Sequence, residues 1–289
     1  MSVGATGAGD ARGNVARRGF PLMSYLICFG GIIWREGLRF IHQRERFVSA
    51  LVRPLVWLFI FAAGFRQVLG ISIIPPYETY ILYEVYIAPG LMAMIQLFNA
   101  MQSSLSMVYD REMGNVRTLL TSPLPRWFLL FARLLAGTLV SVLQVYAFLV
   151  IAWMWDITPP PFGYITVLPA LLLSGLMLGA MGLLISSGIR QLENFAGVMN
   201  FVIFPMFFAS SALYPLWRVR EGSPLLYAIC QFNPFTHVVE LIRFALYGRI
   251  SWVSLAVVGG CTVLFLAGAI IAYDPSRGLR RLNVGGGEG

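Results

Sequence analysis

The residues best suited to chemistry or to contact with another protein lie in one charged segment between two apolar runs. Residues 108–134 read V-Y-D-R-E-M-G-N-V-R-T-L-L-T-S-P-L-P-R-W-F-L-L-F-A-R-L. Asp110 can cap the start of a helix, and Glu112 would place a negative charge on its first turn. Pro123 and Pro125 would end it. The segment therefore predicts a short helix that begins after Asp110.

The two faces of this predicted helix allow two interpretations. Met113, Val116 and Leu120 form an apolar stripe, whereas Arg111 and Arg117 point elsewhere. Such a helix can lie in the membrane interface as part of a loop. It can equally dock onto a cytoplasmic protein.

A second set of polar side chains lies inside an apolar run. Gln96, Asn99, Ser103 and Ser106 recur at spacings of three, four and three, so they share one face of a helix. Side chains of this kind form hydrogen bonds between membrane helices. They can also border a substrate pathway, and the spacing is compatible with both.

The residue patterns of enzymes and ion-coupled carriers are absent from the sequence. It contains no G-x-S-x-G, no H-E-x-x-H, and no Lys to complete a phosphate-binding loop. Cys28, Cys230 and Cys261 are isolated, which predicts neither a metal site nor a disulfide framework. The apolar runs lack Asp, Glu and His, which disfavours coupling to protons or sodium. We expect no catalytic residue, metal or cofactor in this chain.

The composition indicates an all-α polytopic membrane protein. The chain has 289 residues, of which 58% are hydrophobic and 12% charged, and its mean hydropathy is +0.74. Six apolar runs predict spanning helices. In the first one the apolar stretch between Arg53 and Arg66 is short for a span, so both arginine side chains would have to extend to the membrane interface. The predicted spans are 48–69, 86–109, 134–155, 165–189, 196–217 and 250–273.

The ends of the chain differ from this membrane domain, which we assign to residues 20–274. Residues 1–19 are rich in Gly and Ala and predict a disordered tail, and residues 275–289 form a second tail. Between residues 25 and 48, apolar side chains recur at helical spacing opposite several arginines. This pattern predicts an amphipathic helix in the headgroup plane before the first span.

The segment before the last span is mixed in polarity. Asn233 is suited to cap a helix, Pro234 fits its first position, and Gly248 fits its end. Glu240 and Arg243 argue against an ordinary span. We predict a helix on the external side that is re-entrant or lies in the interface.

Arginines are divided unevenly between the two sides that six spans would create. The side with both termini and residues 108–134 holds sixteen of the 21 arginines, and the other side holds five. Because positively charged loops stay in the cytoplasm, both termini and the charged segment are predicted to be cytoplasmic.

Taken in this order, the motifs resemble those of type-2 ABC transporter permeases, which include polysaccharide, nodulation-factor and drug-resistance exporters. The resemblance rests on the amphipathic N-terminal helix, on R-E-M-G-N-V-R-T-L-L-T-S-P-L-P-R at 111–126, and on N-P-F-T-H-V-V-E-L-I-R at 233–243. The family pattern is similar at both places: R-E-x-G-T/N with a later Leu-Leu and Pro, then N-P-x-T/S with an acidic residue and Leu-x-R.

The resemblance implies an export permease of the bacterial inner membrane. It would move a lipid-like, glycan or drug-like substrate, as a homodimer or half of a heterodimer. Two copies of a separate ATPase subunit would bind ATP and Mg. The alternatives are a membrane scaffold or assembly factor and a secondary carrier. The residues expected to couple to the ATPase are Arg111, Glu112, Met113, Gly114, Arg117, Leu119 and Leu120. The stripe of Gln96, Asn99, Ser103 and Ser106 is the candidate pathway, and Asn233, Pro234, Glu240 and Arg243 form an external motif.

Overall fold

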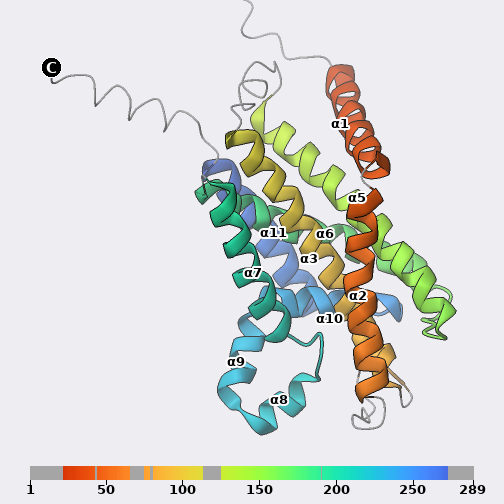
Figure 1. The fold of residues 1–289 in the computed structure, drawn as a ribbon. Coiled ribbons are helices and arrows are strands. Elements are labelled where there is room, and N and C mark those ends of the chain that lie inside the picture. Colours follow the sequence, from red (N-terminus) through yellow and green to blue (C-terminus); the bar gives the residue numbers. More distant parts are fainter. Residues whose placement is uncertain are drawn as a thin grey trace, which may run out of the picture.

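The described part of the chain is helical throughout. A computed structural model of the protein describes residues 22–42, 44–65, 75–78, 81–112, 125–189 and 191–272, and these ranges contain no strand. The predicted all-α class is therefore confirmed for them. The helices are α1 (Leu22–His42), α2 (Arg44–Phe65), α3 (Tyr83–Glu112), α5 (Arg126–Met154), α6 (Gly163–Gly188), α7 (Leu192–Phe208), α8 (Leu216–Gly222), α9 (Pro224–Phe232), α10 (Pro234–Leu246) and α11 (Trp252–Ala272) (Figure 1).

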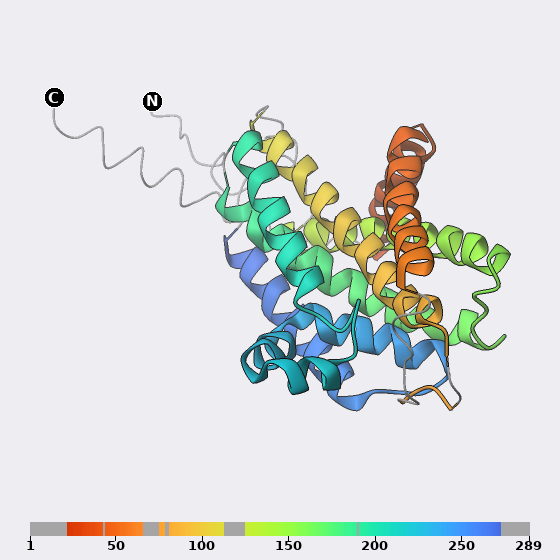
Figure 2. The same ribbon diagram turned by 60° about the horizontal axis from the view of Figure 1, so that its bottom comes forward.

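Helix α3 lies at the centre of the bundle. It packs against α2, α5, α6, α7 and α10, and α6 in turn packs against α11. Helices α8 and α9 form the lower end of the molecule in Figure 1, far from α1 at the top. In Figure 2 α10 lies across the direction of α3 and α7, on the side of the bundle that holds α8 and α9. A displacement of one end of α3 would therefore change its contacts with most of the neighbouring helices.

Three described helices are long and apolar enough to cross a membrane: α5 from Trp127, α6 and α11. They coincide with the predicted spans 134–155, 165–189 and 250–273, although α5 begins eight residues before its predicted start. Two shorter apolar stretches, Leu51–Ile60 in α2 and Glu193–Phe208 in α7, correspond to two more predicted spans. The count of six spans stays a prediction.

The predicted amphipathic segment, residues 25–48, falls on two described helices. Helix α1 covers it to His42 and α2 covers it from Arg44, and residue 43 between them lies outside the described residues. In α2 the guanidinium of Arg53 lies 3.9 Å from the ring centroid of Phe98 on α3. The ring face attracts this cation, which lies between apolar residues of α2.

Asp110 does not begin a helix, contrary to the prediction from its cap preference. It lies inside the last turn of α3, which continues to Glu112. No Gly or Pro separates Ser106 from Glu112, and extending a formed helix costs less than nucleating a new one. The short helix expected after Asp110 falls mainly on residues 113–124, outside the described residues.

The predicted fifth span, 196–217, is interrupted. Helix α7 ends at Phe208, and residues 209–215 form a non-helical connection before α8. The Ser210 hydroxyl donates to the carbonyl of Phe207 and accepts from the amide of Ala212, which draws these backbone groups away from helical pairing. We refer to residues 209–215 as the outer connection, after the side of the membrane on which the sequence analysis predicts them to lie.

The outer connection packs directly on α3 at Gly90. A Cβ atom at Gly90 would lie 2.7 Å from the carbonyl oxygen of Ala212 and 2.8 Å from its Cα. Any larger residue there would push the two backbones apart. The absence of a side chain at Gly90 thus fixes where the connection crosses α3.

Candidate functional site: a polar face of α3 and an outer motif

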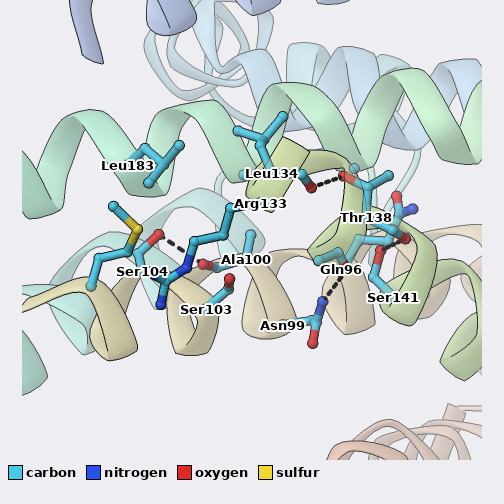
Figure 3. Close-up of a pocket in the computed structure, with 14 residues that line it drawn as sticks. Gln96, Asn99, Ala100, Ser103, Ser104, Arg133, Leu134, Thr138, Ser141 and Leu183 are labelled. Atoms are coloured by element: carbon cyan, nitrogen blue, oxygen red, sulfur yellow. Dashed lines mark hydrogen bonds between the residues drawn. The ribbon is translucent and has the colours of Figure 1, made fainter. Parts of the chain in front are cut away.

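Gln96 is the most buried member of the polar stripe on α3. Its side chain, labelled in Figure 3, is fully buried. Its Nε2 donates to the carbonyl of Leu171 at 2.7 Å, and its Oε1 accepts from the Ser174 hydroxyl at 2.6 Å. Both partners lie on α6. The amide therefore joins α3 to α6 with both of its polar ends.

The remaining stripe residues face α5. Asn99 donates through Nδ2 to the carbonyl of Gly137 at 2.9 Å. Ser106 accepts a hydrogen bond of 2.8 Å from the Arg133 guanidinium, and its own hydroxyl donates to the carbonyl of Ser103. The four stripe residues thus lie between two neighbouring helices, as their spacing on one face requires.

Arg133 is a member of this site that sequence reasoning missed. It is nine-tenths buried and lies on α5 beside the stripe, among the residues drawn in Figure 3. In the sequence it is one more arginine near the end of an apolar run. The signal that could have found it is the extension of α5 back to Arg126, which places Arg133 two turns inside a helix.

A small polar cavity lies between α3, α5 and α6. The space open to the centre of a water molecule is about 20 Å³, enough for one or two waters at roughly 10–15 Å³ each. No acidic side chain occurs among the described residues that line it. They are Gln96, Asn99, Ala100, Ser103, Ser104, Met107, Arg133, Leu134, Gly137, Thr138, Ser141, Gly175, Gly179 and Leu183.

Glycines on α6 set the distance between the helices around this polar cavity. A Cβ at Gly175 would lie 2.7 Å from Cγ2 of Thr138, and one at Gly182 would lie 2.4 Å from the Ser104 hydroxyl. At Gly179 the nearest atom would be at an ordinary 3.4 Å. The close approach thus depends on Gly175 and Gly182 more than on Gly179.

The residues expected to couple to an ATPase are placed only in part. Arg111 and Glu112 are the last two residues of α3. The others, Met113, Gly114, Arg117, Leu119 and Leu120, lie outside the described residues. The observation that bears on coupling is therefore the continuity of α3 from its polar stripe to Glu112.

The outer motif begins at Asn233, which joins two helix ends. Its Oδ1 accepts from the amide of Phe235 and so caps α10, where Pro234 takes the first position. Its Nδ2 donates to the carbonyls of Met206 and Ala209 at the end of α7, at 2.7 and 2.6 Å. One amide therefore satisfies orphan groups of both helices.

Arg243 holds α10 to the outer connection. It forms an ion pair with Glu240, donates to the carbonyl of Ser211 at 2.8 Å, and lies 4.1 Å from the ring centroid of Tyr86 on α3. Burial alone would lower the pKa of Arg243. The neighbouring Glu240 carboxylate favours the charged form, the pKa is raised above its ordinary value, and Arg243 stays charged.

Helix α10 is largely buried among other helices of the bundle. Eight of its thirteen residues are buried, and it contacts α3, α6 and α11. The predicted cap, first residue and exit are confirmed, with Gly248 at φ +66° after the helix. Its position relative to the membrane, re-entrant or interfacial, stays a prediction.

Comparison with known proteins agrees with this arrangement of helices and motifs. The sequence profile of the family described as ABC-2 type transporter matches residues 28–247. The chain belongs to this family. That assignment makes it a membrane subunit of an ABC transporter and confirms the resemblance drawn from the two motifs.

Several relatives of this ABC-2 family member carry names of putative or probable permeases. The chain is 29% identical over 212 residues to "Putative transport permease ycf38" of Cyanophora paradoxa, covering 71% of this chain and 69% of the relative. The protein of the same name in Porphyra purpurea is 26% identical over 211 residues, covering 71% and 68%. "Probable multidrug ABC transporter permease YbhR" of Escherichia coli (strain K12) is 30% identical over 165 residues, which is 56% of this chain and 43% of that protein.

Proposed function

We propose that this ABC-2 permease exports an amphipathic substrate and that α3 transmits the movement of an ATPase partner. One observation carries the proposal: α3 is a single 30-residue helix that begins beside Arg243 of the outer motif, passes the polar cavity and is described as far as Glu112. At 1.5 Å per residue it is about 45 Å long. Displacement of its Glu112 end would therefore reach both sites.

The proposed assembly contains two permease copies and two copies of a separate ATPase subunit that binds ATP and Mg. The absence of Lys supports this division of labour, because a phosphate-binding loop needs one. The proposed topology has six spans in a bacterial inner membrane, as the apolar runs predict. The arginine distribution supports an orientation with both termini and the residues after Glu112 in the cytoplasm and the outer motif on the other side.

The proposed substrate is a lipid-like, glycan or drug-like molecule that carries neutral hydrogen-bonding groups. The stripe offers amides and hydroxyls, and one relative is named a multidrug ABC transporter permease. A cavity of about 20 Å³ is too small for such a molecule. Transport would therefore require α3 to separate from α5 or α6, exchanging the present hydrogen bonds for contacts with the substrate.

Co-reconstitution tests this proposal. The permease would be placed in proteoliposomes alone and with the ATPase that co-purifies with it, and substrate accumulation would be followed with and without ATP. We expect ATP-dependent movement away from the ATPase face only when both subunits are present. Transport driven by a proton or sodium gradient would indicate a secondary carrier. Stable association without substrate movement would indicate a scaffold.

A further inference from the structure

A wide cavity lies at the end of the bundle where α3 begins. Its lining comes from three places: the chain before α3 with its first turn, the connection between α5 and α6, and Tyr247 after α10. The space open to the centre of a water molecule is about 550 Å³, against about 20 Å³ for the polar cavity. Organic ligands commonly occupy pockets of about 300–1,000 Å³. We call this cavity the outer pocket, because this end of the bundle is predicted to be external.

Aromatic and aliphatic side chains form much of the wall of the outer pocket. The rings of Tyr77 and Tyr247 meet edge to face, with their centroids 4.9 Å apart. Leu82 and Val85 add aliphatic surface at the start of α3, and residues 159–161 add three consecutive prolines. Leu82 is 47% exposed, so part of this apolar surface is open to a ligand. Such a wall suits a molecule with an apolar body.

The charged side chains among the described residues that line the outer pocket are both acidic. They are Glu78 and Asp156. Glu78 forms an ion pair with Arg249, and Arg243, whose charge reaches Tyr247, is paired with Glu240. Asp156 forms no ion pair and no side-chain hydrogen bond in the part of the chain that the structure describes. The pocket therefore presents one negative charge that a ligand can neutralise.

The local backbone does not account for an acidic residue at position 156. Asp156 follows the end of α5 with φ +58°, the left-handed conformation in which Gly is the usual residue and Asn the next. A negative charge there is also unfavourable, because the carbonyl end of a helix is itself negative. Asn would keep this backbone without the repulsion. The carboxylate is therefore better explained by the pocket that it lines.

We propose that the outer pocket binds an organic cation with one positive charge and an apolar body. The carboxylate of Asp156 pairs with the charge, and the half-buried ring of Tyr247 offers it a second contact, because aromatic faces attract cations. Leu82 and the prolines contact the apolar body. A divalent metal ion fits less well, because no three His, Cys, Asp or Glu side chains gather at one point among the described residues.

This binding site goes beyond the proposed transport function and is separate from the polar cavity. The two cavities share no lining residue among those that the structure describes. A ligand in the outer pocket touches α3 at Val85, the connection after α5 at Asp156, and the end of α10 at Tyr247. It therefore holds three helix ends together, and its binding requires neither ATP nor the ATPase.

Binding of phenyltrimethylammonium to the full-length chain in lipid nanodiscs tests the proposal. The probe joins a quaternary ammonium group to one phenyl ring, and empty nanodiscs of the same lipid give the background. Asp156→Asn removes the charge but keeps a residue that tolerates a positive φ, so the end of α5 should stay folded. Glu221→Gln on α8 is the matched control, because it removes an exposed carboxylate outside the pocket.

We expect saturable binding to the unmodified chain and to Glu221→Gln, and roughly fivefold weaker binding to Asp156→Asn. Leu82→Arg, which places a positive charge at the exposed edge of the pocket, should abolish binding. The neutral molecule of the same shape, tert-butylbenzene, should compete poorly. Absence of saturable binding to the unmodified chain would overturn the proposal. So would unchanged affinity in Asp156→Asn, an equal loss in Glu221→Gln, or equally effective competition by tert-butylbenzene.

Discussion

Replacing Gly175 by Ala tests whether the contact between α5 and α6 is as tight as its geometry indicates. The new Cβ would lie 2.7 Å from Cγ2 of Thr138, whereas ordinary contacts begin near 3.4 Å. Thr138 cannot turn away freely, because its hydroxyl donates to the carbonyl of Leu134 at 2.9 Å. Overpacking of this kind costs about 1–3 kcal/mol.

Gly259→Ala on α11 is the matched control, because no atom lies within 4 Å of the Cβ it would add. Both variants gain the same helix propensity, about 1 kcal/mol, so their difference isolates the steric cost. Reversible unfolding in mixed detergent micelles should give Gly175→Ala a free energy of unfolding about 1–3 kcal/mol below that of Gly259→Ala.

A rescue variant separates this contact from other effects of the substitution. Thr138→Ser removes Cγ2 but keeps the hydroxyl that bonds to Leu134, so in the Gly175→Ala background it should recover most of the lost stability. If Gly175→Ala is as stable as the Gly259 control, or if Thr138→Ser recovers nothing, the packing argument is refuted.

Three further predictions concern the stripe, the coupling end and the topology. Gln96→Leu removes two interhelical hydrogen bonds, which should lower the free energy of unfolding by about 1 kcal/mol. Reconstituted transport should fall by a much larger factor than this loss of stability explains. If transport falls only in proportion to stability, Gln96 is a packing residue only. Glu112→Arg should abolish co-purification of the ATPase while the chain still inserts, since reversing a buried interface charge costs about 2–5 kcal/mol; unchanged binding would reject this contact. In a background without the three native cysteines, Gly114→Cys should react only from the cytoplasm and Pro160→Cys only from outside, and the opposite pattern would invert the topology.

Features that depend on local chemistry could be predicted from the sequence. Helix α10 begins and ends near the residues its caps indicate, because Asn233, Pro234 and Gly248 act on their own backbone neighbours. Helices α6 and α11 follow from the length of their apolar runs. In these cases the deciding interactions lie within a few residues along the chain.

Features that depend on distant contacts could not be predicted in the same way. The apolar run through residues 196–217 looks continuous, but its break is stabilised by Asn233 and by the space above Gly90, both far away in the sequence. Arg133 reads as one more interfacial charge because its acceptor, Ser106, lies 27 residues earlier. Pairings of this kind become visible only when the helices are placed side by side.

The exposure of α11 has a consequence for adaptation to different membranes. Only Ser254, Val258 and Ala269 are buried among its 21 residues. At 1.5 Å per residue the helix spans about 31 Å, close to an average hydrocarbon thickness. Hydrophobic mismatch can therefore be adjusted by lengthening, shortening or tilting this helix, with few changes to the interior. Homologues from thinner or thicker bilayers should differ in length at α11 while keeping the glycine contacts of α3 and α6.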